Sequence, residues 1–560
     1  AVRDPKAAEP WEHLAAVERR RGRLDEAIQA ARAVCALRRD SPEAFFRVCH
    51  LVIAKHGMGG ALPVLEEATR LWPDNAEAWK NLGTALANLH RARPALAALE
   101  RASGLQPGLP GIDLGLGLAY QDSGRLTEAI QAYGRVLAAD PSHAEAGSAR
   151  LLCLNYSDAS DAPVVAGAAR AYGAARPRRG PAWRAPAPWD GVRPLRVAVV
   201  SPDLRRHAVA QFFLPLLAHL PPGELEVWLY HDHPIEDAVS AELKKHAARW
   251  TSLAGLPHDS VRDRLRADAP DLLLDLAGHT GFNRLPVYAE RVAPVQVSYL
   301  GYPGTTGLAE MDFRLTDAFA DPEGVTDAWH TERLVRFSSC AWAFSPAPDS
   351  GAVEAPRGGA GEPVVFGSFN TPAKLSDATL RLWARVLEAT PGSRLLLKGH
   401  GFDEPQNVAE WRGRFSACGL DPHRVDLVGR IASTGGHLAL YARVDVALDP
   451  FPYHGTTTTC EALWMGRPVV TLAGGEHRSR VGVSLLSAAG HPEWIAETPD
   501  SYVEIACALA RDLEGRRALA ASLRENISRG ALLDYAGQAR AFSSALRSCT
   551  AEVAKTLARG

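Results

Sequence analysis

The stretch that decides the fold reads Leu448-Asp-Pro-Phe-Pro-Tyr-His-Gly-Thr-Thr-Thr-Thr-Cys-Glu-Ala-Leu-Trp-Met-Gly466. An apolar run, a proline-rich turn and an apolar helical pattern follow one another, which predicts a strand, a turn and a helix. Capping a helix needs one threonine, and four stand here in a row. Free N–H groups and hydroxyls at such a helix start can bind a diphosphate without a metal. Glu461, one turn further on, could accept hydrogen bonds from ribose hydroxyls.

Strand-like and helical patterns alternate from residue 195 onward. Candidate strands cover 195–201, 225–231, 271–277 and 295–301, then 364–369, 394–399, 424–429, 444–449 and 467–473, with helical stretches near 208–219 and 236–249. This alternation implies parallel sheets covered by helices on both faces. Two Rossmann-like units, at 195–345 and 364–560 around a loose linker at 346–363, would face a cleft with the carboxyl ends of their strands. Neither contains G-x-G-x-x-G, so no nicotinamide or flavin cofactor is predicted.

Residues 1–150 repeat with a period of 34. Large residues recur at Trp11, Phe45 and Trp79, prolines at Pro73, Pro107 and Pro141, and alanines at Ala27, Ala61, Ala95 and Ala129. The pattern resembles tetratricopeptide repeats, whose small residues let paired helices approach and whose proline opens the next helix. We expect an α-superhelix at 1–150 with a concave surface that binds peptides, and then a helical and irregular connector at 151–194.

Two further strand ends carry residues that could face the cleft. In Phe366-Gly-Ser-Phe-Asn-Thr-Pro-Ala-Lys374, the lysine could neutralise charge on a leaving diphosphate, a task for which some cation is needed when no metal is bound. His207 follows the strand at 195–201 and would enter from the opposite side, either as general base or as a residue that positions the acceptor. A surface lysine and a structural histidine are the alternatives.

Three more segments could complete the rim. The turns at 275–280 and 300–307 hold Thr280 and Tyr302, and His437 follows another strand end, where its ring could stack on a base. Tight turns without ligand contacts, and a capping or exposed histidine, are the alternatives for these segments.

The composition limits the partners. Lys and Arg number 62 and Asp and Glu 64, so the charge balance gives no reason to expect nucleic acid. The eight cysteines are widely spaced without C-x-x-C, which favours a reducing cytoplasm and argues against a zinc site. No apolar run reaches the roughly 18 residues of a membrane span. We therefore expect a cytoplasmic protein with no nucleic-acid partner, no membrane span and no bound metal.

The order of the motifs along the chain resembles that of a known family. The repeats are followed by D-L-x-x-H at 203–207, G-Y-P-G-T-T-G at 301–307, F-N-x-x-x-K at 369–374 and H-G-T-T-T-T-C-E-A-L-W-x-G at 454–466. This order resembles the O-linked N-acetylglucosamine transferase family over nearly the whole chain. The resemblance implies a GT-B fold, UDP-N-acetylglucosamine as donor without a metal cofactor, protein Ser and Thr as acceptors, and inversion at the anomeric carbon.

The resemblance also implies roles for individual residues. Lys374 would bind the diphosphate together with the helix start, Glu461 would bind ribose, His437 would pack on uracil, and His207 and Thr280 would line the sugar and acceptor side. We predict His207 and Lys374 as catalytic residues, and as substrate-binding residues Thr280, Tyr302, Thr371, His437, His454, Gly455, Thr456, Thr457, Thr458 and Glu461. Thr371 stands where animal relatives carry Gln, and their large insert between lobes is missing.

Two other functions fit the same motifs. A related enzyme adds glucose from UDP-glucose to Asn of proteins, and it shares the fold. A repeat scaffold whose GT-B part binds nucleotide without turnover is the alternative from a different class.

Overall fold

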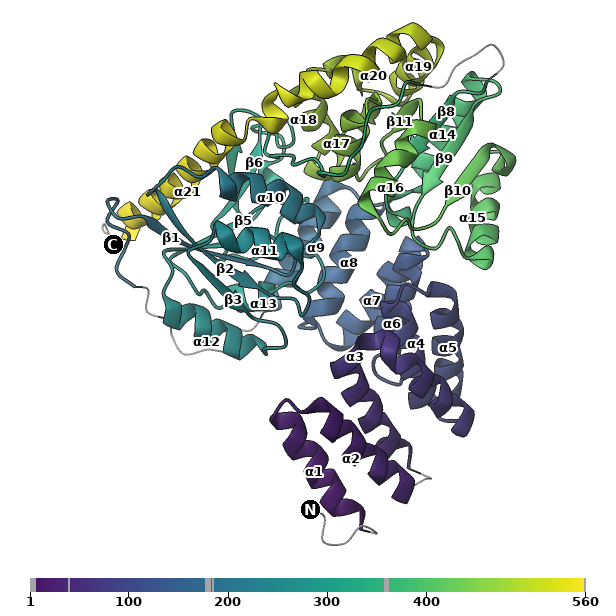
Figure 1. Cartoon of the computed structure of the whole chain (residues 1–560), viewed down its shortest axis with the longest axis vertical. Helices are drawn as coiled ribbons and strands as arrows, with labels where there is room; N and C mark the ends of the chain where they lie inside the picture. Colours follow the sequence, from purple (N-terminus) through teal and green to yellow (C-terminus); the bar gives the residue numbers. More distant parts are fainter. Residues whose placement is uncertain (1–6, 39–40, 177–182, 184–185, 357–361, 558–560) are drawn as a thin grey trace. The chain divides into compact units, whose positions relative to one another are not determined.

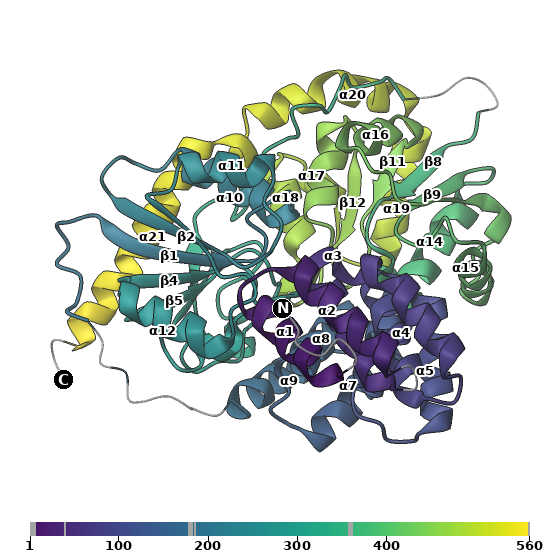
Figure 2. The same ribbon diagram turned by 60° about the horizontal axis from the view of Figure 1, so that its bottom comes forward.

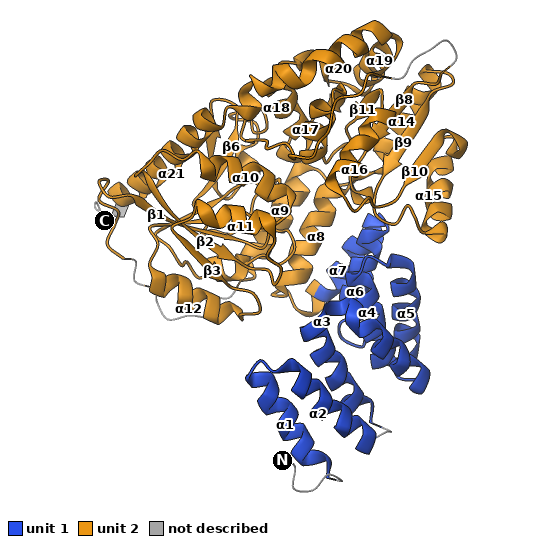
Figure 3. Cartoon of the chain, in the orientation of Figure 1, with its two compact units in different colours: residues 1–136 blue, residues 137–560 orange. Residues whose placement is uncertain are grey.

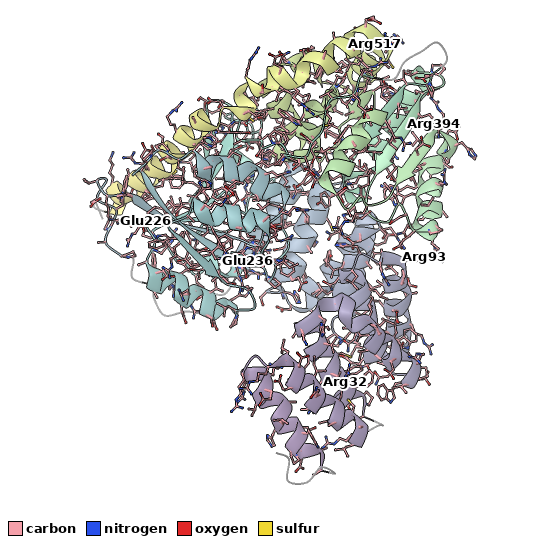
Figure 4. All side chains as sticks on the ribbon, in the orientation of Figure 1. Arg32, Arg93, Glu226, Glu236, Arg394 and Arg517 are labelled. Carbon is pink, nitrogen blue, oxygen red and sulfur yellow. The ribbon has the colours of Figure 1, made fainter. Side chains whose placement is uncertain are left out.

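The computed structural model describes the chain except residues 1–6, 39–40, 177–182, 184–185, 357–361 and 558–560. It consists of two compact units, Ala1–Val136 and Leu137–Gly560 (Figure 3). Side chains of both charge signs occur on both units, as the net charge of −2 leads one to expect. Figure 4 labels Arg32, Arg93, Glu226, Glu236, Arg394 and Arg517 among them.

The first unit is built of consecutive helix pairs. Its helices are α1 (Ala8–Arg20), α2 (Leu24–Leu37), α3 (Pro42–Leu71), α4 (Ala76–Asn88), α5 (Ala92–Leu105), α6 (Ile112–Asp122) and most of α7 (Leu126–Ala139). The four alanines of the predicted repeat are all fully buried. At Gly117 an added Cβ would lie 2.4 Å from the ring of Tyr133, so this helix pair requires glycine there. The repeat positions therefore act as close helix contacts, as predicted.

Helix α3 is long and apolar enough to pass for a membrane span by length and composition alone. Its helical geometry breaks at Gly57, where φ is 71° and ψ is −178°. Its buried residues on both sides of the break, such as Val48 and Leu65, belong to the apolar core of the first unit. These are properties of core helices in a repeat array.

The second unit begins with helices and continues into a seven-stranded parallel sheet. We call this sheet and the helices that connect its strands the N-lobe. Helices α8 (Ala144–Tyr156) and α9 (Ala162–Ala174) come first. The strands are β1 (Leu195–Ser201), β2 (Leu225–His231), β3 (Arg249–Ser252), β4 (Leu272–Asp275), β5 (Val295–Ser298), β6 (Phe313–Asp317) and β7 (Arg333–Phe337). Their order is β3-β2-β1-β4-β5-β6-β7. Helices α10 (Ala208–Ala218), α11 (Ala238–Lys245), α12 (His258–Asp268) and α13 (Leu285–Tyr288) connect them (Figures 1 and 2).

A six-stranded parallel sheet forms the C-lobe. Its strands are β8 (Val365–Ser368), β9 (Arg394–Lys398), β10 (Val425–Val428), β11 (Val446–Leu448), β12 (Val469–Leu472) and β13 (Ile495–Ala496). Their order is β10-β9-β8-β11-β12-β13. The helices are α14 (Asp377–Ala389), α15 (Pro405–Ala417), α16 (Thr434–Ala439), α17 (Thr457–Trp464), α18 (Val481–Ala488), α19 (Pro499–Arg511) and α20 (Leu513–Ser528).

The last helix returns to the other lobe. Helix α21 (Tyr535–Leu557) packs on α10, β5 and β7 of the N-lobe (Figure 1). Phe542 contacts the rings of Phe213 and Tyr299 at centroid distances of 6.4 and 5.8 Å. The predicted boundary that assigns 364–560 to one lobe therefore misses this crossing, which burial of apolar rings stabilises.

The predicted boundaries at 151–194 and 346–363 also differ from the structure. Helices α8 and α9 belong to the compact unit of the two lobes, which begins at Leu137, whereas the sequence places residues 137–150 with the repeats. The described part of the linker is tied to the C-lobe: Trp464 donates a hydrogen bond to Ser350 Oγ at 3.0 Å, and Arg467 donates to the carbonyl of Glu354 at 2.7 Å. The described part of this segment is therefore held against the C-lobe, although its composition predicts a loose linker.

Candidate active site

Both sheets reverse their strand order at a point that the predicted residues flank. In the C-lobe the reversal lies between β8 and β11. Lys374 follows β8, and the threonine run follows β11. In the N-lobe the reversal lies between β1 and β4, and His207 follows β1. Ligands of open parallel sheets bind at such points, outside the carboxyl ends of the strands.

A pocket of about 250 Å³ joins residues of the two lobes. It is lined by His207, Ala208, Val209, Phe212, Leu300, Gly301, Pro303, Trp342, Asn370, Thr371, Lys374, Tyr453, Thr456, Thr457, Thr458, His477 and Val481. The structure thus brings six of the predicted site residues together: His207, Thr371, Lys374, Thr456, Thr457 and Thr458.

The threonine run leaves the start of α17 open. Thr456 is the N-cap residue, and within the described chain no side chain makes a capping hydrogen bond to this helix. Thr458 Oγ1 instead donates to Asn370 Oδ1 at 3.1 Å, and Thr459 Oγ1 donates to the carbonyl of Gly455 at 3.0 Å. The first-turn N–H groups therefore face the pocket without an internal acceptor, which is the arrangement that suits an anion.

Lys374 supplies a cation beside this helix start. Its Nζ donates to the main-chain carbonyl of His454 at 2.9 Å and lies 4.3 Å from the centre of the Tyr453 ring. Burial lowers the pKa of Lys374, and the carboxyl of Asp449 opposes that shift. A phosphate bound nearby would raise the pKa of Lys374 again, because it favours the charged form of the lysine.

Buried side chains hold the turn behind the pocket. Asp449 accepts from the N–H of Gly455 at 2.7 Å and from Thr471 Oγ1 at 2.8 Å. The fully buried ring of His454 bonds the Leu472 carbonyl through Nε2 at 2.9 Å and accepts from the N–H of Gly482 at Nδ1. Burial lowers the pKa of His454 to about 3, so this ring is neutral and structural.

Two residues predicted to bind substrate have a structural role in the fold. The sequence motif predicts His454 and Gly455 as substrate contacts, but the ring of His454 points into the protein and Gly455 does not line the pocket. An added Cβ on Gly455 would lie 2.3 Å from Thr458 Oγ1. Both residues shape the turn that presents Lys374 and the helix start.

His437 and Glu461 form a pair of their own. His437 Nε2 lies 3.0 Å from Glu461 Oε2, and the His437 ring contacts Phe369 and Tyr441 at 5.8 and 5.9 Å. Neither lines the pocket described above. Tyr441 connects the pair to the helix start, because its hydroxyl donates to the carbonyl of Thr458 at 3.1 Å. The predicted contacts with uracil and ribose stay predictions.

On the N-lobe side, His207 reaches the pocket and two other predicted residues do not line it. His207 is the N-cap of α10, and its Nδ1 accepts from the N–H of Val209 at 3.3 Å. Thr280 donates to the carbonyl of Ala277 at 2.9 Å, and the buried hydroxyl of Tyr302 accepts from Asn155 at 2.6 Å. Thr280 and Tyr302 thus stabilise loops next to the pocket.

The lining residues that were not predicted from sequence include Trp342, Asn370, Tyr453 and His477. Asn370, Tyr453 and His477 each stand in a loop after a strand, the signal that identified Lys374. Asn370 lies in the same segment as Lys374, and Tyr453 in the same segment as the threonine run, so their position after a strand is a signal that could have identified both. Trp342 lies beyond the end of β7, and no local pattern marks it.

Comparison with known proteins decides the family. The model of "Glycosyl transferase family 41" matches residues 187–341 and 357–541, more than half of the 560 residues. The chain belongs to glycosyl transferase family 41. Residues 114–143 of this family 41 protein also match a tetratricopeptide repeat.

A solved structure shares the fold of this family 41 protein over most of its length. A solved variant of the O-GlcNAc transferase of Thermobaculum terrenum is 32% identical with a TM-score of 0.86, and the match covers 92% of this chain and 98% of that one. The two lobes therefore form a GT-B fold. Among described residues there is no group of three or more His, Cys, Asp or Glu that could hold a metal ion.

Curated plant proteins share the two lobes. The probable UDP-N-acetylglucosamine–peptide N-acetylglucosaminyltransferase SPINDLY of Oryza sativa subsp. japonica is 37% identical over 426 residues, 75% of this chain and 46% of that protein. The protein of the same name from Solanum lycopersicum is 38% identical over 418 residues, 73% of this chain and 44% of that protein. The chain spans about half the length of the curated relatives it matches.

Proposed function

We propose that this protein transfers N-acetylglucosamine from UDP-N-acetylglucosamine to serine and threonine hydroxyls of proteins, with inversion at the anomeric carbon. The observation that carries the proposal is the pairing of Lys374 with the uncapped start of α17 in one pocket. A cation and a set of free N–H groups match a departing diphosphate. The names of the relatives described above supply the sugar and the class of acceptor.

In this reaction the acceptor oxygen attacks the anomeric carbon from the face opposite UDP, and the bond to the β-phosphate oxygen breaks. Lys374 and the first turn of α17 stabilise the negative charge that develops on the diphosphate. These groups are already in place before the reaction, so their alignment costs no reorganisation as charge develops. Lys374 does the work that a metal does in other transferases, so we propose that no metal is required.

The N-lobe face of the pocket would receive the acceptor hydroxyl, where His207, Leu300 and Trp342 line it. We propose that the helical repeats bind protein substrates in their groove, as concave repeat surfaces do. All eight cysteines are free thiols, which supports a reducing compartment such as the cytoplasm as the place of action.

A donor panel tests the proposal. Purified protein is titrated calorimetrically in EDTA with UDP-N-acetylglucosamine, UDP-glucose and a GDP-linked sugar, because a purine diphosphate could use the same lysine and helix start. We expect binding of UDP-N-acetylglucosamine. In transfer assays with a soluble protein extract, Lys374→Ala should lower turnover about 100- to 1,000-fold while its UDP affinity falls less than tenfold. Lys245→Ala, an exposed lysine of the N-lobe, is the matched control.

The product separates the alternatives. Sugar that alkaline β-elimination releases from protein is bound to Ser or Thr, whereas sugar that survives alkali after transfer from UDP-glucose indicates N-glucosylation of Asn. Exclusive use of the GDP-linked sugar would overturn the uridine donor. Donor binding without any transfer would support the scaffold. A Lys374→Ala protein that is as active as the wild type would overturn the role of Lys374 in stabilising the leaving diphosphate.

A further inference from the structure

His477 is the pocket residue whose ring is prepared to accept a proton. It opens a short 3-10 turn (His477–Ser479) after β12 and lines the same pocket as Lys374 and the start of α17. Only 5% of its surface is exposed. Its partner, Asp321, follows β6 of the other lobe and is fully buried. The pair therefore joins the two lobes at the pocket.

The hydrogen bonds decide which ring nitrogen carries the proton. His477 Nδ1 lies 2.6 Å from Asp321 Oδ2, and the same oxygen accepts from Thr316 Oγ1 at 2.6 Å. The pKa of Asp321 lies well below its usual value, because the neighbouring histidines offset the cost of its burial. An ionised carboxylate can only accept, so His477 carries its proton on Nδ1. Nε2 is left with the lone pair.

His207 has the opposite arrangement. Its Nδ1 accepts the N–H of Val209 at 3.3 Å and lies 3.5 Å from Asp203 Oδ1. Burial lowers the pKa of His207, with Asp203 opposing, so the ring is neutral and Nδ1 keeps its lone pair for Val209. The proton is then on Nε2. In this form His207 can donate a hydrogen bond into the pocket but cannot accept a proton at Nε2.

The groups around His477 include some that raise the pKa of its ring and some that lower it. Asp321 favours the imidazolium, while burial, Arg314 and His330 disfavour it, and the pKa of His477 lies below its usual value. Arg314 approaches Nε2 only to 3.5 Å and makes its short bond, 2.7 Å, to the carbonyl of Tyr302. On the turn itself, Arg478 pairs with Glu476 at 2.6 Å. His477 is thus neutral at neutral pH, with a carboxylate ready to stabilise its charged form.

We propose that His477 is the catalytic base of the transfer, with Asp321 as its positioning residue, and that His207 orients a substrate as a hydrogen-bond donor. This rests on the transferase activity proposed above. As the acceptor oxygen bonds to the anomeric carbon, its proton passes to Nε2 of His477. The electron pair of the breaking bond leaves with UDP. The imidazolium, paired with Asp321, returns the proton to solvent after the products depart.

The test compares single substitutions that keep polarity and volume. Wild type, His477→Gln, His207→Gln and the exposed control His423→Gln are assayed with UDP-N-acetylglucosamine and a fixed library of Ser- and Thr-containing peptides between about pH 5 and about pH 9. We expect His477→Gln to lower kcat about 100-fold or more and to remove the acidic limb of kcat/KM. His207→Gln should raise KM for the peptides and keep the limb. An unchanged Kd for UDP shows that each variant is folded.

Asp321→Asn separates positioning from support of the fold. Removing the carboxylate takes away the group that raises the pKa of His477, so the acidic limb should move to lower pH while the Kd for UDP stays the same. The base assignment is overturned if His477→Gln keeps the limb, or if His207→Gln is the variant that loses it. A wild type that transfers no sugar overturns the transferase function itself, and the base with it.

Discussion

The two lobes use the same sheet topology in opposite ways. Each places a helix directly after a strand at the reversal of strand order, α10 after β1 and α17 after β11. The start of α10 is closed, because the side chain of His207 caps it. The start of α17 is open, and Lys374 stands beside it. Topology therefore provides two possible anion sites, and the side chain at the cap position decides which one a ligand can use.

The largest expected effect on nucleotide binding comes from disturbing the open helix start. An added Cβ at Gly455 would lie 2.3 Å from Thr458 Oγ1 and 3.0 Å from Asn370 Oδ1. Because both groups must shift, we expect Gly455→Ala to weaken UDP binding about 30-fold, as measured by calorimetry. The control is Gly475→Ala, where no atom lies within 4 Å of the added carbon. Equal affinity of the two variants would show that the turn does not set the helix start.

A smaller effect should follow from Thr458→Val. The substitution keeps the shape of the side chain and removes the hydroxyl that bonds Asn370 at 3.1 Å. Losing one such bond costs about 1 kcal/mol, so we expect UDP affinity to fall roughly fivefold. Thr498→Val, in an exposed capping position of the same lobe, provides the comparison. A Thr458→Val protein with wild-type affinity would mean that backbone N–H groups alone define the site.

The protonation of Lys374 on UDP binding gives a further test of the open helix start. Burial lowers the pKa of Lys374 in the empty pocket, and a bound diphosphate raises it again. At a pH above the lowered pKa, UDP binding should therefore take up as much as about one proton. Calorimetry in buffers of different ionisation enthalpy measures this uptake, and Lys374→Met should abolish it. Uptake that persists in the variant would assign the proton to another group.

The smallest effect on nucleotide binding is expected at the closed helix start. His207→Ala removes the cap of α10, which should lower the free energy of unfolding by about 1 kcal/mol. The Kd for UDP should stay within about twofold, because the diphosphate binds at the other lobe. Urea unfolding and calorimetry measure the two quantities. A large loss of UDP affinity in this variant would erase the proposed difference between the lobes.

Local pattern was enough for much of the fold. The apolar runs at 195–201 and 225–231 are strands β1 and β2 as predicted, and the alanines at the repeat positions are buried. The open start of α17 could be predicted because its features, a strand, a turn and a threonine run, are adjacent in sequence. Strands β3, β6, β7 and β13 were not predicted. Charged or polar residues interrupt the apolar ones in β3, β6 and β7, and β13 has only two residues.

The sequence by itself determined the repeat array, the two parallel sheets and the threonine run at the start of α17, since each depends on periodicity or on residues close together in the chain. Lys374 could be added to this site because it too follows a strand of the C-lobe. Only the tertiary structure decided that the ring of His454 points inward, that α21 crosses to the N-lobe, and that His477 meets Asp321. These contacts join residues far apart in sequence. They depend on how the strands are ordered and how the lobes pack, and no local pattern of hydrophobicity encodes that order.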